Sequence, residues 1–538
     1  MQRPGVLAAA LLVAGLTVAV AAPSLRYDFV YDDEALILER KPFWELGASA
    51  FLQSAPWVTG RHLTAVSLDL DRLGTRGKPD AFAFHRTNLL VASLLSVMVL
   101  AFALRLGLSL PAATMAAAIF AVHPTHVDAV VSIVGRAELL AAAGTLAVLL
   151  ICVRPRTGGA TAGGAWVALG SAVFGTLAMH SKESALALPL LVVLARGVLG
   201  SRVAWLPALA GCGVAMLGWL AVTGASMASV DRTQFVDNPL VYAPILERIP
   251  KALAVLWHYA LLLVWPHPLL LDRSFAETNP SLVAGWMAAL AWTAAAAALW
   301  TFRRRAPLVV FALAWFPVSF AITANVAKPI GTMMAERVLL LPSLSVCLLA
   351  GLAVGSLART RGGRLAAVLV VAVVVAVLFG LYRERAAPWQ NGDVYFAASA
   401  AGSPRSAKAQ YDYGNWMLRK GNREEAEAAY ARALAIVPDF SRAASYRAES
   451  MARRGDAGGG ADVYLAYLAH SPEDWGAVTN VTRLLLDAGR PEEAVDWARR
   501  LVTLRPEDPL SIDTLVLAET AARRARERAG SAAAPESR

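Results

Sequence analysis

Residues 365–382 read LAAVLVVAVVVAVLFGLY, an apolar run of eighteen residues without a charged side chain. Arg359, Arg361 and Arg364 precede this run, and a polar sequence rich in Arg, Glu, Ala and Gly follows it. A run of about 17–25 apolar residues can cross the roughly 30 Å hydrocarbon core of a bilayer as a helix. The run therefore predicts a membrane-spanning helix, with a change of character in the chain beyond residue 382.

Similar apolar runs occupy most of the preceding sequence, and the whole chain is 57% hydrophobic and only 17% charged. They lie at 5–22, 88–107, 111–130, 137–153, 164–180, 185–200, 203–223, 281–300, 307–325 and 338–358. The first run could be a signal peptide, since Ala19-Val20-Ala21 resembles a cleavage site. It is long for that purpose, so we expect a retained anchor. Residues 1–382 are thus predicted to form a polytopic membrane helix bundle in an all-α protein.

Arginine clusters beside these runs indicate the topology. The net charge is +10, and the clusters lie at 154–156, 303–305 and 359–364. Positively charged loops favour the cytoplasmic side, and all of these clusters can lie there only if the shorter run 251–266 does not cross. About eleven crossings then remain, and the residues after 383 lie outside. Membrane topology thus explains the basic charge, and we exclude nucleic-acid binding.

The polar segments between the runs are all predicted on the non-cytoplasmic face. They lie at 23–87, 123–128, 180–183, 224–250, 267–280 and 326–337. Ionisable residues beside apolar spans are costly and line a site or cavity more often than they face lipid. Any single loop could be a solvated end, but their common side indicates an outward-facing reaction centre. The Arg- and Ala-rich composition favours a bacterial inner membrane, with this centre in the periplasm or cell exterior.

The remaining sequence repeats every 34 residues. Pro404, Pro438, Pro472 and Pro506 share this spacing, as do Gly421, Gly455 and Gly489. A 34-residue period is typical of tetratricopeptide repeats, each a helix–turn–helix unit. We predict a linker over 383–404, a short repeat solenoid over 405–528 with a terminal helix near 507–527, and a disordered tail over 529–538. Such an array is expected to bind a protein partner, or to serve as a spacer.

The most unusual polar cluster is the run Asp32-Asp33-Glu34 in the first outer segment. Repulsion between neighbouring carboxylates raises a pKa, and a partly buried carboxylate of this kind can act as a general base. The alternative for Asp33 is a helix cap. Asp32 and Asp33 are therefore the candidate catalytic residues.

The other outer segments supply candidate substrate-binding residues. These are Arg61, His85, His123, His126, Arg136, Glu138, Lys182, Glu183, Asp272, Glu336 and Arg337. Arg and His at a lipid–water boundary can hold a phosphate through charge-assisted hydrogen bonds, although Arg337 could instead extend to the interface. His123 and His126 have no obvious third metal ligand, so no metal site is predicted.

Cys152, Cys212 and Cys347 lie in apolar runs, which excludes a disulfide framework. Nucleotide-binding glycine loops and a serine nucleophile elbow are absent from the sequence.

Several of these segments together resemble one family. They are Val30-Tyr31-Asp32-Asp33, His123-Pro124-Thr125-His126-Val127-Asp128, Gly135-Arg136-Ala137-Glu138, Ser181-Lys182-Glu183, Trp265-Pro266-His267-Pro268 and Gly331-Thr332-Met333-Met334-Ala335-Glu336-Arg337. With the repeats, they resemble the transmembrane and tetratricopeptide-repeat (TMTC) O-mannosyltransferases, which belong to the GT-C glycosyltransferases. The resemblance covers nearly the whole chain and suggests a prokaryotic member.

The resemblance implies a membrane glycosyltransferase that moves mannose or another hexose from a polyprenyl-phosphate donor. The acceptor would be a hydroxyl of a protein or glycan on the non-cytoplasmic face. One carboxylate of Asp32 and Asp33 would deprotonate or position this hydroxyl, and Arg136, Lys182, Arg337, His123 and His126 would stabilise the departing phosphate. The acidic pair could recruit a divalent metal ion, although the family resemblance does not demand one. A non-enzymatic envelope scaffold is the main alternative, and a transporter is disfavoured because the spans show no internal repeat.

Overall fold

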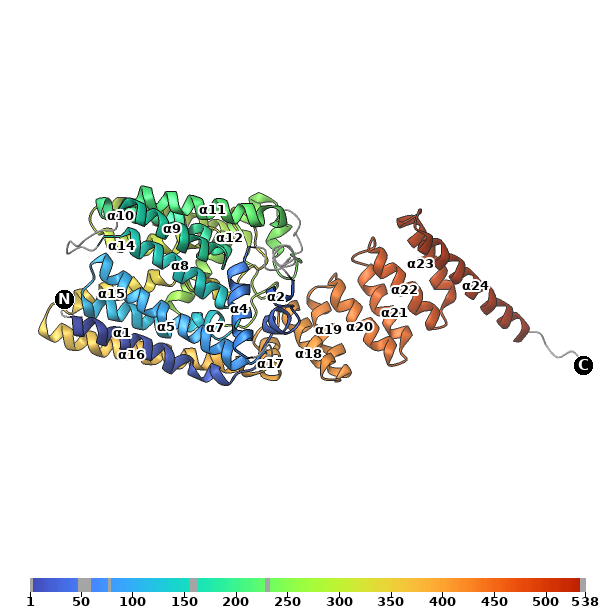
Figure 1. Cartoon of the computed structure of the whole chain (residues 1–538). Helices are drawn as coiled ribbons and strands as arrows, with labels where there is room; N and C mark the ends of the chain where they lie inside the picture. The colour runs from blue at the N-terminus through green and yellow to red at the C-terminus, as the bar shows by residue number, and fades with distance from the viewer. Residues whose placement is uncertain (1–2, 47–59, 76–78, 155–162, 228–232, 533–538) are drawn as a thin grey trace, which may run out of the picture. The chain divides into compact units, whose positions relative to one another are not determined.

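The computed structural model describes residues 3–46, 60–75, 79–154, 163–227 and 233–532 (Figure 1). Within these ranges the regular secondary structure is helical, apart from one isolated bridge between Val153 and Val203. The predicted all-α fold is therefore confirmed.

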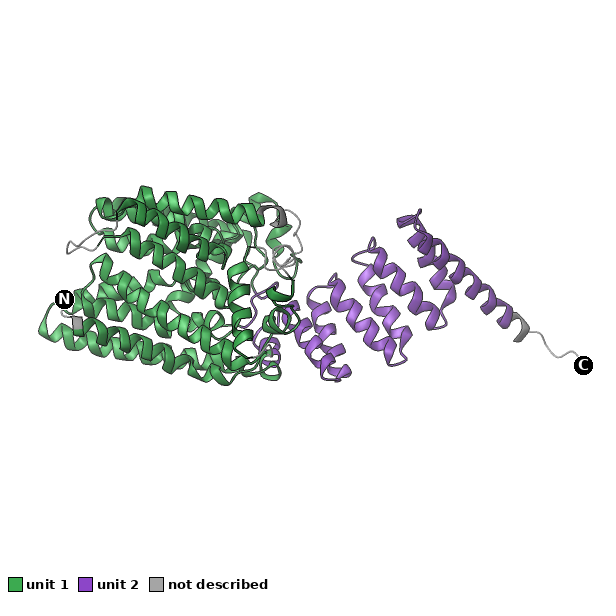
Figure 2. Cartoon of the chain, viewed as in Figure 1, with its two compact units in different colours: residues 1–270, 278–395 green, residues 271–277, 396–538 purple. Residues whose placement is uncertain are grey.

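The chain divides into two compact units, which Figure 2 shows in different colours. Unit 1 comprises Met1–Leu270 and Thr278–Tyr395, and unit 2 comprises Leu271–Glu277 and Phe396–Arg538. The boundary thus lies later than the predicted residue 382, because Tyr382, Arg385 and Trp389 are buried. Most of the predicted linker 383–404 is helical rather than irregular.

Unit 1 contains long apolar helices joined by short helical segments. Its longer helices are α1 (Arg3–Ala21), α4 (His62–Gly74), α5 (Ala81–Leu106), α6 (Leu110–Val122), α8 (Arg136–Cys152), α9 (Gly164–Met179), α10 (Leu188–Leu199), α11 (Trp205–Met227), α12 (Ile245–Val264), α13 (Leu282–Phe302), α14 (Pro307–Phe320), α15 (Leu344–Leu357) and α16 (Arg361–Ala386). The short segments are η1 (Ala22–Arg26), η2 (Glu34–Leu38), α2 (Phe43–Leu46), η3 (Pro124–His126), α7 (Val127–Val130), η4 (Glu183–Ala187), η5 (Gly200–Arg202), η6 (Pro239–Val241), η7 (Glu336–Leu339) and η8 (Ala387–Gln390). Each predicted apolar run overlaps one of the longer helices, but the run 111–130 is divided into α6, η3 and α7 and is not one continuous helix.

Six helices among the described residues are long and apolar enough to cross a membrane. They are Pro4–Arg26, Ala81–Leu106, Glu183–Arg202, Trp205–Thr223, Leu282–Phe302 and Arg361–Gln390. Many large apolar side chains on these helices, such as Leu11, Leu94, Leu290 and Val373, are exposed. Exposed apolar surface on this scale is costly in water and suits lipid.

Helix α12 is longer than the run 251–266 from which it was predicted, and it is not among the span candidates. Its first turns contain Glu247, Arg248 and Lys251. Its apolar face packs against α13 and the loop before η7, with Val255, Tyr259 and Leu263 buried. The run thus belongs to a helix with a charged start and one buried face, and its failure to cross the membrane stays a prediction.

Unit 2 contains the predicted helical repeats. After α17 (Gly392–Gly402), which straddles the unit boundary, the helices are α18 (Ala407–Arg419), α19 (Arg423–Ile436), α20 (Ser441–Arg453), α21 (Ala457–Leu468), α22 (Trp475–Asp487), α23 (Pro491–Leu504) and α24 (Pro509–Ala532). Consecutive helices pack on one another. The three glycines that share the 34-residue spacing have positive φ values of 81°, 91° and 72°, which end the first helix of each pair.

The internal packing of the first repeat explains another glycine. A Cβ at Gly414 would lie 2.6 Å from the ring of Tyr430, so only glycine allows α18 and α19 to approach this closely. The middle repeat keeps its second helix despite Gly458-Gly459-Gly460, because Asp456 accepts a hydrogen bond from the Gly459 N–H and caps α21. Helix α24 continues to Ala532 through the first residues of the predicted tail, and 533–538 lie outside the described residues.

Candidate functional site

A cavity in unit 1 is lined by residues from five separate stretches of the chain. They are Asp32, Leu36, Arg61, Thr64, Ala65, Leu68, Val134, Gly135, Ala137, Glu138, Lys182 and Arg337. The cavity volume is about 50 Å³. Five of the predicted site residues, Asp32, Arg61, Glu138, Lys182 and Arg337, therefore meet at one place although they are distant in sequence.

Short connecting segments position these side chains. Asp32 precedes η2, Arg61 precedes α4, Lys182 precedes η4, and Arg337 lies in η7. Only Glu138 belongs to a long apolar helix, in the first turn of α8. Short segments between apolar helices can present polar groups without burying them in hydrocarbon, which explains why the site forms at these junctions.

Three cations and the two carboxylates Asp32 and Glu138 line the cavity, and their ion pairs with each other and with the neighbouring Asp128 and Glu183 are mostly loose. An Arg337 guanidinium nitrogen lies 3.9 Å from an Asp32 carboxylate oxygen and 4.0 Å from one of Asp128. Lys182 Nζ lies 3.4 Å from Glu138 and 3.8 Å from Glu183. Burial lowers the pKa of Lys182, and the positive charge of Arg61 lowers it further. These ion pairs are longer than the roughly 2.7–2.9 Å of a tight charged hydrogen bond.

Arg61 is held more firmly than the other two cations. Its Nε and a terminal nitrogen lie 2.9 and 2.6 Å from the two carboxylate oxygens of Glu183. This bidentate pair fixes Arg61 at the cavity wall. Glu183 thus contributes by holding Arg61, although it does not itself line the cavity.

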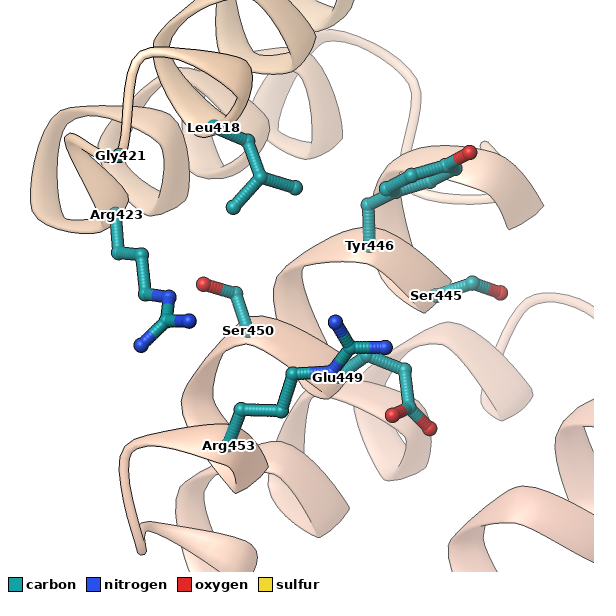
Figure 3. A pocket seen from close by; sticks show the side chains of 8 residues that line it. All are labelled: Leu418, Gly421, Arg423, Ser445, Tyr446, Glu449, Ser450 and Arg453. Atoms are coloured by element: carbon teal, nitrogen blue, oxygen red, sulfur yellow. The ribbon is translucent and has the colours of Figure 1, made fainter.

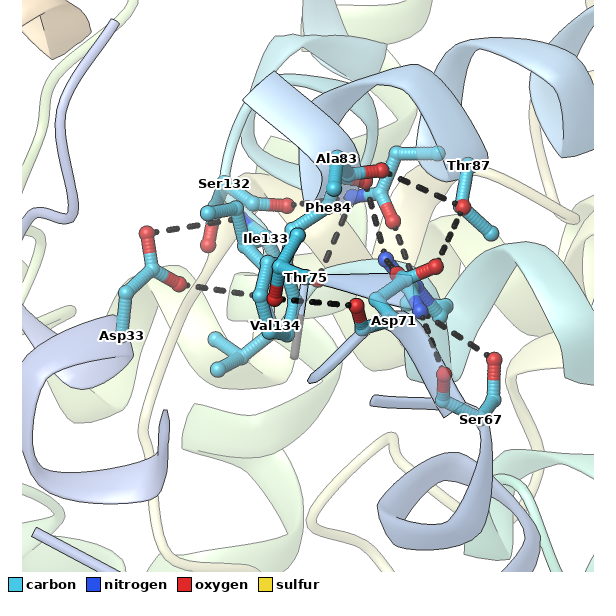
Figure 4. Close-up of polar contacts among 12 residues, drawn as sticks. Asp33, Ser67, Asp71, Thr75, Ala83, Phe84, Thr87, Ser132, Ile133 and Val134 are labelled. Atoms are coloured by element: carbon cyan, nitrogen blue, oxygen red, sulfur yellow. Dashed lines mark hydrogen bonds and ion pairs between the residues drawn. The ribbon is translucent and has the colours of Figure 1, made fainter. Parts of the chain in front are cut away.

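The two predicted catalytic carboxylates have different environments. The Asp32 side chain lines the cavity and is 40% exposed. Asp33 is 1% exposed, and its carboxylate accepts backbone N–H groups of Val134 at 3.0 Å, Val30 at 3.4 Å and Ile133 at 3.5 Å (Figure 4). Burial raises the pKa of Asp33 to about 7, the charge of Asp32 contributes to the rise, and the backbone hydrogen bonds oppose it. Asp33 does not cap η2 through its side chain; it ties the first loop to residues 133–134.

Tyr31 makes a left-handed turn immediately before these two carboxylates. Its φ of +59° lies in the left-handed region, which is uncommon for a residue other than glycine. The Tyr31 ring stacks on Tyr395, with centroids 5.4 Å apart and an angle of 29° between the planes. Backbone strain of this kind persists where the surroundings hold it and is concentrated at functional sites.

Gly135 allows the wall of the cavity to form. A Cβ there would lie 2.6 Å from the carbonyl oxygen of Asp128 and 2.5 Å from that of Ala129. Because these distances are so short, a residue with a Cβ could occupy position 135 only if the backbone shifted. The turn at 132–135 therefore packs directly on α7, which places Asp128 near Arg337.

Arg136 is predicted as a phosphate ligand, but the structure engages it elsewhere. Its side chain is fully buried and lies 2.6 Å from Asp71. Its other contacts are with Asn88 at 2.7 Å, the Phe84 carbonyl at 2.9 Å, and the Ser67 carbonyl and hydroxyl at 3.0 and 3.2 Å. Figure 4 shows the acceptors Asp71, Ser67 and Phe84 of this network. Each of its three nitrogens has an acceptor, so Arg136 holds α4, α5 and α8 together.

The remaining predicted residues also lie outside the cavity lining. His123 contacts Thr125 at 2.7 Å and the Leu263 carbonyl at 3.1 Å, and His126 contacts the Ser343 hydroxyl at 2.8 Å. His85 is buried beside Tyr27. Glu336 accepts hydrogen bonds from Arg385 at 3.0 Å and the Leu270 N–H at 2.8 Å.

Asp272 belongs to unit 2, where it accepts a hydrogen bond from Ser406 at 2.6 Å at the start of α18. It therefore lies with the repeats and not with the residues of the cavity.

No group of three or more His, Cys, Asp or Glu side chains within the described ranges is arranged to hold a metal ion. Sequence reasoning missed Asp128, which neighbours Arg337, and Asp71, which pairs with Arg136. Asp128 lies in the quoted segment 123–128, so its position in that segment was a usable signal. Asp71 had no comparable signal.

Three named relatives match most of the chain. Human protein O-mannosyl-transferase TMTC4 is 26% identical over 496 residues, which cover 78% of this chain and 65% of that protein. Protein O-mannosyl-transferase TMTC3 of Mus musculus is 25% identical over 474 residues, which cover 80% of this chain and 51% of that protein. Protein O-mannosyl-transferase F38B6.6 of Caenorhabditis elegans is 25% identical over 350 residues, which cover 60% of this chain and 46% of that protein. The chain is TMTC-like. The resemblance noted in the motifs is thus confirmed.

This TMTC-like chain spans between about half and two thirds of the length of these relatives. No protein-family model matches it. Among solved structures, the APC/C hetero-tetramer Cut9–Hcn1 aligns over 87% of this chain and 92% of that chain, at 12% identity and a TM-score of 0.24. That score is too low to support an argument about fold or function.

Proposed function

We propose that the protein is a membrane glycosyltransferase that moves a hexose from a polyprenyl-phosphate donor to a hydroxyl group. The observation that carries the proposal is the convergence of Asp32 with Arg61, Lys182 and Arg337 at one cavity. One exposed carboxylate can accept a proton, and three nearby cations can bind an anionic leaving group. The names of the relatives favour mannose as the sugar and a protein as the acceptor.

The reaction that fits this arrangement is a displacement at the anomeric carbon. Asp32 accepts the proton of the acceptor hydroxyl as its oxygen forms a bond to the anomeric carbon. The bond from this carbon to the phosphate oxygen breaks, and the electron pair leaves with the phosphate. A sugar-linked phosphodiester with one negative charge becomes a phosphomonoester that can hold two.

The cations are suited to this gain of negative charge. Arg337 and Lys182 are each at least 3.4 Å from their carboxylate neighbours, so a phosphate can replace these loose contacts with closer ones. Burial lowers the pKa of Lys182, and a nearby phosphate would stabilise its charged form. Electrostatic groups placed where charge develops supply a large part of many rate accelerations.

The proposed donor explains why such a site would lie between membrane helices. A polyprenyl tail stays in hydrocarbon, so its sugar phosphate is presented at the membrane surface. We propose that this surface is the periplasmic face of a bacterial inner membrane. The cavity volume is about 50 Å³, and we propose that its lining widens as the donor binds.

A transfer assay on purified full-length protein tests the proposal. The reaction contains polyprenyl-phosphate mannose with a radioactive sugar and a Ser/Thr-containing peptide, and the labelled peptide is counted. We expect Asp32→Asn to reduce transfer at least about a hundredfold, because a general base contributes about 10²–10⁴-fold. The thermal transition should stay within a few degrees of the wild type.

Glu39→Gln is the matched control, since Glu39 is an exposed carboxylate of the same loop that does not line the cavity. Equal activity of the Asp32→Asn variant and the wild type would refute the role of Asp32. Absence of transfer by the wild type with polyprenyl-phosphate and nucleotide donors alike would favour the scaffold alternative.

A further inference from the structure

The repeats of unit 2 contain a second and much larger hollow, with a volume of about 600 Å³ (Figure 3). It is lined by Leu418, Gly421, Arg423, Ser445, Tyr446, Glu449, Ser450 and Arg453. These residues come from the turn between α18 and α19 and from one side of α20. Ligand pockets typically enclose about 300–1,000 Å³, so this hollow has the size of a binding site.

Two arginines at this hollow have no partner. Arg423 and Arg453 are exposed, and neither makes a side-chain hydrogen bond or an ion pair with the residues that the structure describes. Two other polar groups of the lining are engaged. Glu449 pairs with Arg483 of α22, and the Ser450 hydroxyl donates a hydrogen bond to Glu427 at 2.8 Å. Arg423 and Arg453 are the cations of the lining, and both are available to a ligand.

The arginines lie beside apolar side chains. Leu418 is half-buried, whereas Tyr446 is 46% exposed although Tyr411 and Tyr430 hold its ring, with centroids 5.9 and 6.0 Å away. Figure 3 shows both arginine side chains and these two apolar side chains around the same hollow. A ring fixed in this way offers apolar contact at a low cost in conformational entropy.

We propose that this hollow binds an acidic segment of another polypeptide. Carboxylates of the segment would accept paired hydrogen bonds from Arg423 and Arg453, the geometry that guanidinium groups favour. An apolar side chain beside the acidic one would pack on Leu418 and Tyr446. The volume exceeds the needs of a single small anion, and the mixture of cations with apolar contacts matches an acidic and apolar peptide. The proposal concerns partner binding and does not depend on the transferase reaction.

A binding experiment on the full-length protein in detergent micelles tests this inference. The probe is a fluorescein-labelled octapeptide of alternating Glu and Leu, and its binding is measured by fluorescence anisotropy. The comparison peptide replaces every Glu by Gln. We expect the acidic peptide to bind at least about tenfold more tightly than the amide peptide, with the affinity decreasing as salt increases.

Matched pairs of substitutions locate the site. The double variant Arg423→Gln with Arg453→Gln should bind the acidic peptide at least about tenfold more weakly than the wild type. The affinity of the corresponding double Lys variant should lie between the affinities of these two proteins. The control is Arg523→Gln with Arg524→Gln, which removes the same charge from exposed positions of α24. Thermal unfolding of each variant verifies that it is folded.

Three results would overturn the proposal. One is equal affinity of the wild type for the acidic and amide peptides. Another is an equal loss of affinity for the acidic peptide in the Arg423/Arg453 and the Arg523/Arg524 double Gln variants. The third is tighter binding of an oligodeoxythymidylate than of the acidic peptide with the same dependence on Arg423 and Arg453, which would indicate a nucleic-acid site.

Discussion

Arg136 and Arg337 look alike in sequence, because each lies at the start of an apolar helix within a polar motif. The structure separates them. Arg136 is fully buried, with Asp71 2.6 Å away and an acceptor at every nitrogen. Arg337 is 29% exposed and lies 3.9 Å from an Asp32 carboxylate oxygen and 4.0 Å from one of Asp128. A charge with all its contacts satisfied holds the fold together, and one with loose contacts can still bind a ligand. The distances to the counter-charges thus distinguish a structural cation from a candidate functional one.

The largest predicted effect is on the structural side of this comparison. Arg136→Gln leaves Asp71 without its buried counter-charge, and breaking a buried pair in this way costs about 3–5 kcal/mol. We expect a large decrease in the thermal transition and in the yield of folded protein, measured by size-exclusion chromatography in detergent. The double variant Arg136→Gln with Asp71→Asn should recover part of the loss, since neither side chain is then charged. A single variant as stable as the wild type would show that the network does not support the fold.

The second effect concerns Asp33, which also lies on the structural side. Its pKa of about 7 in the folded protein exceeds the value of about 4 expected in the unfolded chain. The folded state therefore binds the proton more tightly, so this contribution to stability is full below about pH 4 and is lost as the pH rises to about 7. Asn cannot ionise. Between pH 5 and 8, the stability difference should move in favour of Asp33→Asn by on the order of 2 kcal/mol.

Thermal transitions of both proteins at the two pH values measure this change. Glu39→Gln, which alters an exposed carboxylate of the same loop, provides the control. If the difference in thermal transition between Asp33→Asn and the wild type does not vary with pH, the raised pKa assigned to Asp33 is wrong.

The fold could be predicted largely from the sequence because its signals are local. Apolar runs of helical length and a 34-residue period each report directly on a helix or a repeat unit. The first unit extends beyond the predicted residue 382 to Tyr395, because the polar sequence after residue 382 still packs within it. The end of α16 is polar but packed: Arg385 forms a buried pair with Glu336, and Trp389 is also buried.

The candidate site was harder to predict than the fold. Sequence identified the segments that carry polar groups, but it could not show which side chains share a cavity. Adjacent residues such as Asp32 and Asp33 meet different environments, because successive residues of one helical turn project in different directions. Burial and partner distances are set by contacts between remote segments, such as Asp33 with Val134, and no spacing rule gives these contacts.

A smaller effect is expected on the functional side of the comparison. Arg337→Gln should decrease transfer about tenfold by removing one cation from the leaving group. The thermal transition should decrease far less than in Arg136→Gln, because the ion pairs of Arg337 are long and partly exposed. Arg337→Lys keeps the charge and should restore part of the rate. A large fall in stability without a change in the rate per folded molecule would instead place Arg337 beside Arg136 as a structural cation.

The smallest effect tests how Asp32 is directed toward the cavity. In Tyr31→Gly, relief of the left-handed backbone gains about 1 kcal/mol, whereas loss of the ring costs about 0.5–1.5 kcal/mol for the stack on Tyr395 and in addition the apolar area that the ring buries. The loss exceeds the gain by a small amount, so the thermal transition should decrease by a few degrees. The chain before Asp32 becomes freer, and a less fixed carboxylate should slow transfer a few-fold. Tyr31→Phe keeps the ring and should retain the wild-type thermal transition, and its transfer rate measures the contribution of the Tyr31 hydroxyl, which interacts with Arg337. If Tyr31→Gly transfers sugar at the wild-type rate, the stacked ring does not orient Asp32, and the cavity lining alone must hold that carboxylate in place.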